Sequence, residues 1–334
     1  MIELDFRGAR VFVAGGAGFV GSALVRELLA AGAKVTVFDN FLHGHRSNLE
    51  EVKGAISIVP GDLLDTWKLI DAARAANPDY IFDCVGDTYV PSAYDAPRRF
   101  FQINVEGTLN ILLLAKQLDV KRVLYVSSTE VYGEAKSALI SEDHVLAPLN
   151  TYAVSKLAAD RLCYTLFLEH DIPVVIARIF NAFGPRESEP YVIPEIILQL
   201  HKGNKIRLGN VGARRDFTYV HDTARGLMAL LLSQCKNGEA VNVGSGEAHS
   251  VREIAELIAK LMGRTDLEIE VDPRRLRKHD IELFRCDPSR LKELTGWKPL
   301  LSLEEGLYRT VQWFHNSGSR WTWEDFVDET TMYR

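Results

Sequence analysis

A glycine-rich turn between an apolar run and a helix-like stretch constrains the fold of this chain more than any other feature. Gly15, Gly18 and Gly21 follow the apolar residues 10–14 and lead into the helical pattern of residues 22–31. Glycines at this spacing allow a tight turn, close approach of the backbone to a pyrophosphate, and close packing of a helix on a strand. The N-terminus of that helix adds hydrogen-bond donors and positive potential. The segment therefore predicts a dinucleotide-binding turn.

Strand-like and helix-like stretches alternate through the first half of the chain. The predicted strands after residues 10–14 are residues 34–38, 56–59, 80–84, 122–127 and 174–179, and the predicted helices include residues 66–76, 100–117 and 152–170. Strands that alternate with helices of this length predict an α/β fold, a Rossmann-type doubly wound parallel sheet with helices on both faces.

The alternation loosens after about residue 180, where glycines punctuate the chain and a basic cluster appears. We therefore expect a Rossmann domain over residues 1–180 and a smaller C-terminal substrate-binding lobe over residues 181–334. A helix at 223–232 and a strand at 240–243 fit the first sheet, so residues 217–246 are expected to return to it.

Composition narrows the function classes. The 334 residues carry a formal net charge of −6, which gives no basic field for nucleic acid. No apolar run approaches the roughly 18 residues of a membrane span, and the N-terminus lacks a signal pattern. The four cysteines have no metal-binding spacing, so we expect reduced thiols, no metal and a cytoplasmic location. One basic cluster is predicted to hold a phosphate: Arg274, Arg275, Arg277 and Lys278.

Asp39 points to the type of dinucleotide. It follows the second predicted strand, 18 residues after Gly21. A carboxylate at this place accepts hydrogen bonds from both ribose hydroxyls and repels a 2′-phosphate, which favours NAD over NADP. Two alternatives remain: Asp39 is an ordinary surface aspartate, or His43 and Arg46 meet a 2′-phosphate.

Tyr152 and Lys156 have the spacing of a proton-transfer pair. They stand at i and i+4 of a predicted helix and share one face, where an ammonium group lowers the pKa of a tyrosine from about 10. Such pairs also occur by accident on surface helices. The strand predicted at 122–127 favours the functional interpretation, because it runs into Ser128 and Glu130, and open α/β sheets bind ligands at the carboxyl ends of their strands.

These residues, together with further segments, resemble one family. The matching segments are residues 15–21, 39–40, 61–63, 104–108, 127–133, 152–156, 178–181, 183–186, 215–222 and 296–299. In this combination the chain resembles the extended short-chain dehydrogenase/reductases that modify nucleotide-activated sugars. The resemblance covers nearly the whole chain, and it implies an enzyme that uses NAD and acts on a nucleotide-diphosphate sugar.

The resemblance implies a role for each matching position. Ser128 hydrogen-bonds the sugar O4, Tyr152 takes the O4 proton as the C4 hydride passes to NAD⁺, and Lys156 holds the nicotinamide ribose. The positions matched to cofactor contacts, with Asp62 at the adenine, are Gly15, Gly18, Phe19, Val20, Gly21, Asp39, Asn40, Asp62 and Leu63. The positions matched to the sugar diphosphate are Asn181, Arg215 and Arg277. The structural alternatives are a helix cap for Asn181 and solvated side chains for the two arginines.

Glu130 bears on the choice of reaction. In the resembling 4,6-dehydratases a glutamate here removes the C5 proton after C4 oxidation, and water then leaves C6. Thr129 stands where many of these enzymes have aspartate, which changes the proton donor. Residues 271–277 and 286–289 look most like the GDP-mannose 4,6-dehydratases, so the resemblance favours a 4,6-dehydratase acting on a GDP-hexose. The alternatives are a 4-epimerase or a UDP-glucuronate decarboxylase, which share the C4 oxidation, and a non-catalytic NAD-binding scaffold.

Two further expectations follow from the resemblance. Residues 84–87 replace a run of small residues and glutamine beside the cofactor, and Asp87 within them either alters the sugar pocket or is solvated. The helices matched by residues 100–117 and 152–170 form a four-helix dimer interface in the family, so a homodimer is expected. Their apolar residues, such as Leu113 and Leu166, are equally consistent with a core-facing role.

Overall fold

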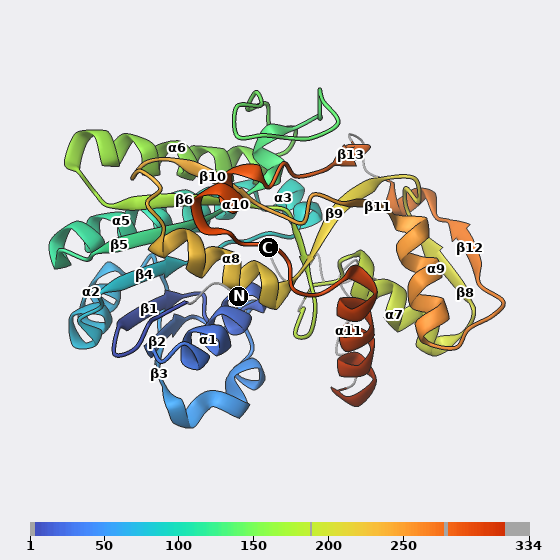
Figure 1. Ribbon diagram of the computed structural model, residues 1–334, viewed down its shortest axis with the longest axis horizontal. Coiled ribbons are helices and arrows are strands. Elements are labelled where there is room, and N and C mark those ends of the chain that lie inside the picture. The colour runs from blue at the N-terminus through green and yellow to red at the C-terminus, as the bar shows by residue number, and fades with distance from the viewer. Residues whose placement is uncertain (1–3, 188, 277–279, 318–334) are drawn as a thin grey trace.

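A seven-stranded parallel sheet forms the centre of the first lobe (Figure 1). The computed structural model describes residues 4–187, 189–276 and 280–317. In spatial order the strands are β10 (Ala240–Val243), β6 (Val174–Ile179), β5 (Arg122–Ser128), β4 (Tyr80–Asp83), β1 (Arg10–Ala14), β2 (Lys34–Asp39) and β3 (Ile56–Pro60). All neighbouring strands run parallel. The strand order reverses between β1 and β4, which confirms the doubly wound fold and places the switch point beside the glycine turn.

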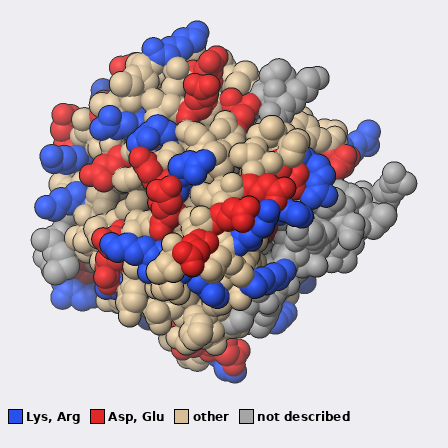
Figure 2. Space-filling model, turned by 90° about the vertical axis from the view of Figure 1, so that its right-hand side faces the viewer, with Lys and Arg blue, Asp and Glu red and all other residues tan. Residues whose placement is uncertain are grey.

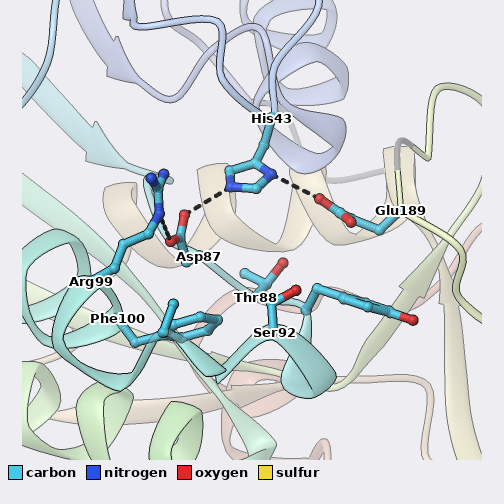
Figure 3. A pocket seen from close by; sticks show the side chains of 9 residues that line it. His43, Asp87, Thr88, Ser92, Arg99, Phe100 and Glu189 are labelled. Carbon is cyan, nitrogen blue, oxygen red and sulfur yellow. Dashed lines mark hydrogen bonds and ion pairs between the residues drawn. The ribbon is translucent and has the colours of Figure 1, made fainter. Parts of the chain in front are cut away.

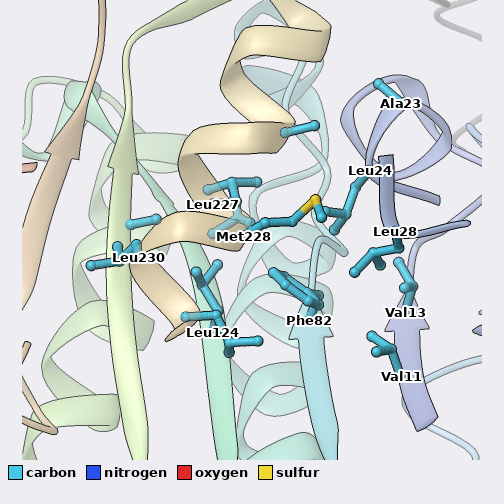
Figure 4. Close-up of a cluster of buried hydrophobic side chains, with 14 of the residues drawn as sticks. Val11, Val13, Ala23, Leu24, Leu28, Phe82, Leu124, Leu227, Met228 and Leu230 are labelled. Atoms are coloured by element: carbon cyan, nitrogen blue, oxygen red, sulfur yellow. The ribbon is translucent and has the colours of Figure 1, made fainter. Parts of the chain in front are cut away.

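Helices cover both faces of this sheet. One face carries α1 (Phe19–Ala30) and α8 (Val220–Leu232), and the other carries α2 (Thr66–Ala76), α5 (Gly107–Leu118) and α6 (Thr151–His170). Because side chains alternate along a strand, Val11 and Val13 pack under α1 while Phe12 packs on the opposite face. Figure 4 shows the α1 and α8 side of this core, where Leu24 and Met228 belong to the same buried cluster as the strand residues Val13 and Phe82.

The predicted helix at 100–117 is interrupted. The chain instead forms α3 (Val90–Asp95), α4 (Pro97–Phe101), a π-helical turn at Gln102–Glu106, and then α5. Asn104 is fully buried in that turn, and its amide donates to the Asp87 carbonyl and to the Ser155 hydroxyl. Single π turns inside helices are frequent at functional sites. The periodic pattern missed this turn because a one-residue insertion barely disturbs the apolar spacing.

The second lobe is built around smaller sheets. Its strands are β7 (Asn181–Phe183), β8 (Lys205–Leu208), β9 (Arg214–Tyr219), β11 (Ala248–Ser250), β12 (Glu268–Val271) and β13 (Leu283–Phe284). Its helices are α7 (Val192–Lys202), α9 (Val251–Leu261) and α11 (Leu303–Ser317), whose apolar faces pack around Ile196, Ile254 and Leu307. The short helix α10 (Ser289–Thr295) contacts α8 and β10. Strand β10 lies beside β6, so the chain returns to the first sheet between β9 and β11.

The surface of the second lobe mixes both signs of charge. Figure 2 shows basic and acidic side chains interspersed on the face that looks away from the first lobe. Lys205 on β8 lies 3.0 Å from Glu268 and 3.3 Å from Glu270 on β12, and Arg207 lies 3.3 Å from Glu270. None of the described helices is long and apolar enough to cross a bilayer. Within the same described ranges, no group of three or more His, Cys, Asp or Glu side chains is arranged to hold a metal ion.

A buried ion pair joins the strands to the helix behind them. Arg178 on β6 donates from Nε and Nη2 to the Asp160 carboxylate on α6, at 2.9 and 3.0 Å. Ser127 donates to the same carboxylate at 3.1 Å, and Arg178 Nη1 donates to the Tyr132 hydroxyl at 3.1 Å. Asp160 is fully buried, yet the hydrogen bonds and charge of Arg178 outweigh that burial and hold the pKa of the carboxyl below its usual value. This pair fixes the end of β5 against α6.

Replacing Asp160 with asparagine tests the structural weight of this pair. The variant keeps the side-chain shape but leaves the Arg178 guanidinium buried without its counter-charge. We expect a loss of about 3–5 kcal/mol in the free energy of unfolding, measured by urea denaturation. The control is Glu305→Gln, which breaks the exposed 2.9 Å pair with Arg309 and is expected to cost less than about 0.5 kcal/mol. Equal stability of the two variants would contradict the argument.

Candidate active site

The glycine turn between β1 and α1 is shaped by steric limits. Gly15 has φ +75°, a conformation that side chains rarely adopt. A Cβ on Gly21 would lie 2.1 Å from the Gly15 carbonyl oxygen, so only glycine fits there. Gly18 is less restricted, because the one atom of the described residues within 4 Å of a Cβ built there is the Gly15 carbonyl oxygen, at 3.3 Å. Gly18 caps α1 without a side-chain hydrogen bond, so the backbone amides of Phe19 and Val20 begin the helix at an end suited to an anion.

Asp39 is fastened to this turn. Its carboxylate accepts hydrogen bonds from the amides of Ala17 at 2.9 Å and Phe41 at 2.8 Å. Burial raises the pKa of Asp39, and these two hydrogen bonds oppose the shift. The carboxylate therefore holds the end of β2 against the turn, in the position that the spacing predicted. The alternative of an ordinary surface aspartate is excluded, because Asp39 is only 7% exposed.

Three further predicted cofactor residues lie together past β2 and β3. The Asn40 amide donates to the Asp62 carboxylate at 2.8 Å. Asp62 also accepts from the Leu64 amide at 2.9 Å, which shapes the turn after β3. Leu63 is buried against Gly107, where a Cβ would come within 3.2 Å of the leucine side chain. Asn40 and Asp62 thus lie together just after β2 and β3, and Leu63, the next residue in the chain, is buried.

Ser128, Tyr152 and Lys156 meet at the carboxyl end of β5. Ser128 ends the strand, and its hydroxyl is hydrogen-bonded to Tyr152 near the start of α6. Lys156 is only 3% exposed and donates to the Val126 carbonyl at 2.6 Å. Its ammonium also lies 4.5 Å from the centre of the Tyr125 ring. The structure therefore brings Ser128 and Tyr152 into contact, and it holds the buried Lys156 ammonium against the same strand, at the carbonyl two residues before Ser128.

The pKa of Tyr152 differs from the sequence expectation. Burial raises it above the usual value of 10, the hydrogen bond to Ser128 lowers it, and the charge of Glu130 raises it. The i and i+4 spacing of Tyr152 and Lys156 therefore does not give the lowered tyrosine pKa that was expected, because burial of Tyr152 dominates. The same burial lowers the pKa of Lys156 to about 8, while the Asp83 carboxylate opposes that shift.

Thr129 and Glu130 follow Ser128 in a short 3₁₀ turn (Thr129–Tyr132). Glu130 accepts a hydrogen bond from the Asn150 amide at 3.2 Å, and Asn150 in turn caps α6 through the Ala153 amide. The Thr129 side chain is buried, and its hydroxyl has no hydrogen-bond partner among the residues that the structure describes. A buried, unsatisfied hydroxyl beside a carboxylate is the arrangement that a bound polar ligand would complete.

Asn104 links the loop after β4 to α6, although its only sign in the sequence is its place in the matching segment 104–108. Asn104 accepts from the Asp87 amide at 3.0 Å and donates to the Ser155 hydroxyl at 2.9 Å. Ser155 donates to the Tyr152 carbonyl at 2.7 Å. A hydrogen-bonded path therefore runs from the loop after β4 to the helix that carries Tyr152. Only the fold reveals it, because its members are separated by up to 68 positions along the chain.

The predicted diphosphate residues are only partly assembled. Asn181 lies on β7, and its side-chain oxygen is buried without a partner in the described part of the chain. Arg215 on β9 lies 3.2 Å from Asp280 and 5.3 Å from the Phe284 ring centre. Arg277 lies outside the described residues.

The basic cluster after β12 is largely committed to acidic partners. Arg275 lies 2.8 Å from Glu195, and Arg274 lies 2.7 Å from Asp272. Lys278, like Arg277, lies outside the described residues. The guanidinium groups of Arg274 and Arg275 thus contact carboxylates of their own lobe. These contacts do not support a role for the two arginines in a phosphate site.

Asp87 is neither solvated nor free to turn toward a ligand. Figure 3 shows its carboxylate between Arg99 on α4 and His43 in the loop after β2, at 2.6 and 2.9 Å. The other His43 ring nitrogen lies 3.0 Å from Glu189 of the second lobe. His43 is thus occupied by carboxylates, which argues against the alternative in which it meets a 2′-phosphate.

A family model described as GDP-mannose 4,6 dehydratase matches residues 12–310. The chain belongs to this family. Among curated proteins it is 36% identical to a GDP-6-deoxy-D-mannose reductase of Pseudomonas aeruginosa, over 89% of this chain and 94% of the relative. It is 34% identical to UDP-glucuronic acid decarboxylase 1 of Xenopus tropicalis, over 91% of this chain and 72% of the relative.

Solved structures of related enzymes share the fold. An epimerase from Methanothermobacter thermautotrophicus superposes with a TM-score of 0.88 at 31% identity, covering 98% of this chain and 96% of that one. A dTDP-glucose 4,6-dehydratase from Bacillus anthracis in complex with NAD superposes with a TM-score of 0.84 at 27% identity, covering 93% and 98%. The family therefore includes several reactions on nucleotide sugars, and membership alone does not choose between them.

Alanine at Gly18 and at Gly21 should separate binding from folding. Gly18→Ala is expected to fold, because its backbone is extended and its Cβ meets only Gly15 O at 3.3 Å. The added methyl group points to where a pyrophosphate would approach, so we expect NAD affinity to fall by about tenfold or more in calorimetric titration.

Gly21→Ala is expected to destabilise the protein by about 1–3 kcal/mol or more, because its Cβ would lie 2.1 Å from Gly15 O. Thermal denaturation measures this loss. Gly54→Ala is the control, since a Cβ there meets nothing within 4 Å. Unchanged NAD affinity in Gly18→Ala would remove the turn from the binding site.

Proposed function

We propose that this protein is an NAD-dependent nucleotide-diphosphate-hexose 4,6-dehydratase, with a GDP-hexose as its favoured substrate. The observation that carries the proposal is the position of Glu130 just after β5, where its amide donates to the Ser128 hydroxyl and the charge of its carboxylate acts on Tyr152. An enzyme that only moves a hydride at C4 needs the serine and the tyrosine. A carboxylate held next to them supplies a base for a second carbon.

The residues present fit NAD. Gly15 and Gly21 shape a turn that brings backbone close to a pyrophosphate, and Asp39 stands where a carboxylate selects a ribose with a free 2′-hydroxyl. Asn40 and Asp62 form the adjoining surface. When bound, NAD supplies the hydride acceptor and donor. The Bacillus anthracis dehydratase, whose structure contains NAD, supports the same cofactor.

The chain's own residues then divide the proton chemistry. The Ser128 hydrogen bond opposes the rise that burial causes in the pKa of Tyr152, and it thereby favours the tyrosinate that accepts the proton of the sugar O4 hydroxyl. The Lys156 ammonium, one helical turn after Tyr152 on α6, donates to the Val126 carbonyl, and its pKa of about 8 keeps most of it protonated near neutral pH. Once C4 is a ketone, the C5 proton is acidic, and Glu130 is the base that removes it.

Elimination also needs a group at the leaving oxygen. As the C5 proton passes to Glu130, the C6–O bond breaks and the hydroxyl leaves as water with one added proton. The unsatisfied Thr129 hydroxyl is the nearest neutral donor in sequence to Glu130, and it orients the leaving oxygen. A hydroxyl is a weaker acid than a carboxyl group, so Glu130 itself returns the proton that completes the water. The hydride taken from C4 would then be returned to C6 and a proton added at C5, so that the sugar loses water alone and remains a 4-ketone.

Two alternatives have specific support. The Xenopus tropicalis relative is named as a decarboxylase, and the Methanothermobacter thermautotrophicus neighbour is named as an epimerase. Both reactions use C4 oxidation without loss of water. A scaffold that binds NAD without catalysis is disfavoured, because Ser128, Tyr152 and Lys156 are all present and assembled.

The reaction is tested by product mass. Purified protein with NAD is incubated with GDP-, UDP-, CDP- and dTDP-sugars, including UDP-glucuronate. We expect a GDP-hexose to lose the mass of water. Loss of carbon dioxide would support decarboxylation, unchanged mass with altered retention would support epimerisation, and a gain of two hydrogens with added NADH would support a reductase. If every sugar returns unchanged, the enzyme proposal fails for those substrates.

Glu130→Gln isolates the elimination step. The variant cannot take the C5 proton, so we expect dehydration to fall by about 10²-fold or more while C4 oxidation still raises the absorbance of bound cofactor at its reduced-state wavelength. Glu134→Gln removes the same charge from an exposed side chain nearby and is the control. Full dehydratase activity in Glu130→Gln would remove this residue from the mechanism.

We also propose that the protein is a homodimer joined through α5 and α6. Both helices expose large apolar side chains, with Leu113 on α5 at 40% and Leu168 on α6 at 60% exposure. Val154 and Tyr164 on α6 are similarly exposed, whereas Leu166 faces the core. Adjacent exposed apolar side chains on paired helices mark an association surface.

The double variant Leu113→Glu, Leu168→Glu tests the dimer. Charges on both helices are expected to give monomers in sedimentation velocity at concentrations where the unaltered protein is dimeric. Leu300→Glu, at an equally exposed leucine of the second lobe, is the control and should leave the dimer intact. A monomeric unaltered protein, or a dimeric double variant, would refute this interface.

A further inference from the structure

His43 connects three segments that are far apart in the sequence. Its Nε2 lies 2.9 Å from a carboxylate oxygen of Asp87, and its Nδ1 is hydrogen-bonded to Glu189 at 3.0 Å. The second Asp87 oxygen accepts from Arg99 at 2.6 Å (Figure 3). The Asp87 and Glu189 side chains are 6% and 10% exposed. Two buried carboxylates therefore converge on one imidazole.

The two carboxylates require the charged form of His43. A neutral imidazole has one N–H, so one of its nitrogens would turn a lone pair toward a carboxylate. Burial opposes the charge, but the hydrogen bonds and charges of Asp87 and Glu189 outweigh it and raise the pKa of His43 to about 9. The imidazolium is consequently the form present at neutral pH.

The ion pair crosses the switch point of the sheet. His43 follows β2 and Asp87 follows β4, and β1 with its glycine turn lies between those two strands. Doubly wound sheets bind dinucleotides in the crevice at this point. The loop that carries His43 is also fastened to the turn, because the His45 amide donates to the Ala17 carbonyl at 3.1 Å. The His43 and Asp87 pair thus joins the two sides of the predicted cofactor crevice.

The second lobe reaches the same place through residues 189–191. Besides the contact of Glu189 with His43, the Tyr191 hydroxyl donates to the Thr88 hydroxyl at 2.9 Å. The rings of Tyr191 and Tyr89 meet edge to face with centroids 6.0 Å apart. Residues 189–191 therefore lie along the loop after β4, and His43 ties them to the loop after β2.

The cluster is linked to the catalytic helix as well. The backbone of Asp87 exchanges two hydrogen bonds with the Asn104 side chain, which donates to Ser155 on α6. Phe100, which lines the small cavity beside the cluster, packs edge to face on Tyr152 with centroids 6.3 Å apart. A displacement of Asp87 would therefore reach Tyr152 by two separate routes.

We propose that His43 is a positioning residue that latches the cofactor crevice, joining the loops after β2 and β4 to residues 189–191 and thereby slowing the exchange of bound NAD. The inference rests on the proposed function to the extent that NAD occupies this crevice. A reaction that takes a hydride from the sugar and returns it needs the same cofactor molecule to stay through the turnover. A latch over the crevice serves that need.

The pH dependence has a definite sign. A raised pKa in the folded protein means that the latch is complete at neutral pH and is lost as pH rises through about 9. Asp87 and Glu189 contact His43 directly, and the charges of His43 and His45 act on Asp39. The charged neighbours one contact further away are Arg99 at Asp87 and Glu187 near Glu189. Lys156, with a pKa of about 8, titrates in the same region, so the comparison with a His43 variant is needed to assign the change.

The release rate of the cofactor tests the latch without any turnover. NADH bound to the full chain is displaced by excess NAD⁺ in a stopped-flow instrument, and the fluorescence decay gives the rate. His43→Gln is expected to release NADH about tenfold faster or more at pH 7, because removing one partner of a buried charge pair acts mainly on dissociation. The unaltered protein should approach the rate of the variant above about pH 9, while the difference between them disappears.

Two further variants distinguish a latch from a loss of stability. Glu189→Gln should also speed release, and His43→Gln with Glu189→Gln together should add little, because both remove the same contact. His221→Gln is the control: His221 lies 2.7 Å from Glu27 between α8 and α1, and its removal breaks a comparable pair that does not bridge the loops after β2 and β4. It should leave the release rate unchanged.

The outcomes separate this inference from the proposed function. If the unaltered protein binds no NADH, the proposed function fails and the latch fails with it. If NADH binds, but His43→Gln and the unaltered protein release it at one rate across pH 7–10, the latch alone is overturned. Equal acceleration by His221→Gln would likewise overturn it, because the effect would then follow stability.

Discussion

The buried pair of Asp160 and Arg178 is the interaction on which the catalytic arrangement depends. Asp160 stands one helical turn beyond Lys156 on α6, and Arg178 lies on β6. Their contact also binds Ser127 and Tyr132, which flank the Ser128 to Glu130 segment. A buried ion pair offsets the cost of removing its charges from water only when its hydrogen bonds are complete. Both carboxylate oxygens of Asp160 accept hydrogen bonds from Arg178. The end of β5 and the helix of Tyr152 are therefore held as one unit.

A second cluster of charges holds three loop segments together, as the pair of Asp160 and Arg178 holds a strand against a helix. His43, Asp87 and Glu189 come from three segments that share no strand or helix, and each would be poorly placed alone. A half-buried imidazolium between two carboxylates is stable only while all three stay together. The crevice beside the glycine turn is thus bounded by an electrostatic contact. Such a contact responds to pH and charge more sharply than apolar packing does.

Family membership and active-site geometry carry different information. The match over residues 12–310 identifies the family and its fold, and the relatives named as a reductase, a decarboxylase and an epimerase carry out different reactions on that fold. In the mechanism that we propose, the steps after C4 oxidation depend on Thr129 and Glu130. Burial raises the pKa of Tyr152 and lowers that of Lys156. The protonation of these two groups therefore depends on their burial as much as on their residue types.

The sequence alone determined the features that depend on local spacing. The glycine turn, Asp39 at the end of β2, and Tyr152 with Lys156 on one helix face are fixed by turn sterics and helical period, and these rules act over a few residues. The tertiary structure decided the rest. The partners of Asp87, the π turn around Asn104 and the commitment of Arg274 and Arg275 to carboxylates arise from contacts between distant segments. Burial and charge at such contacts have no signature in the order of residues, because they exist only once the chain has folded.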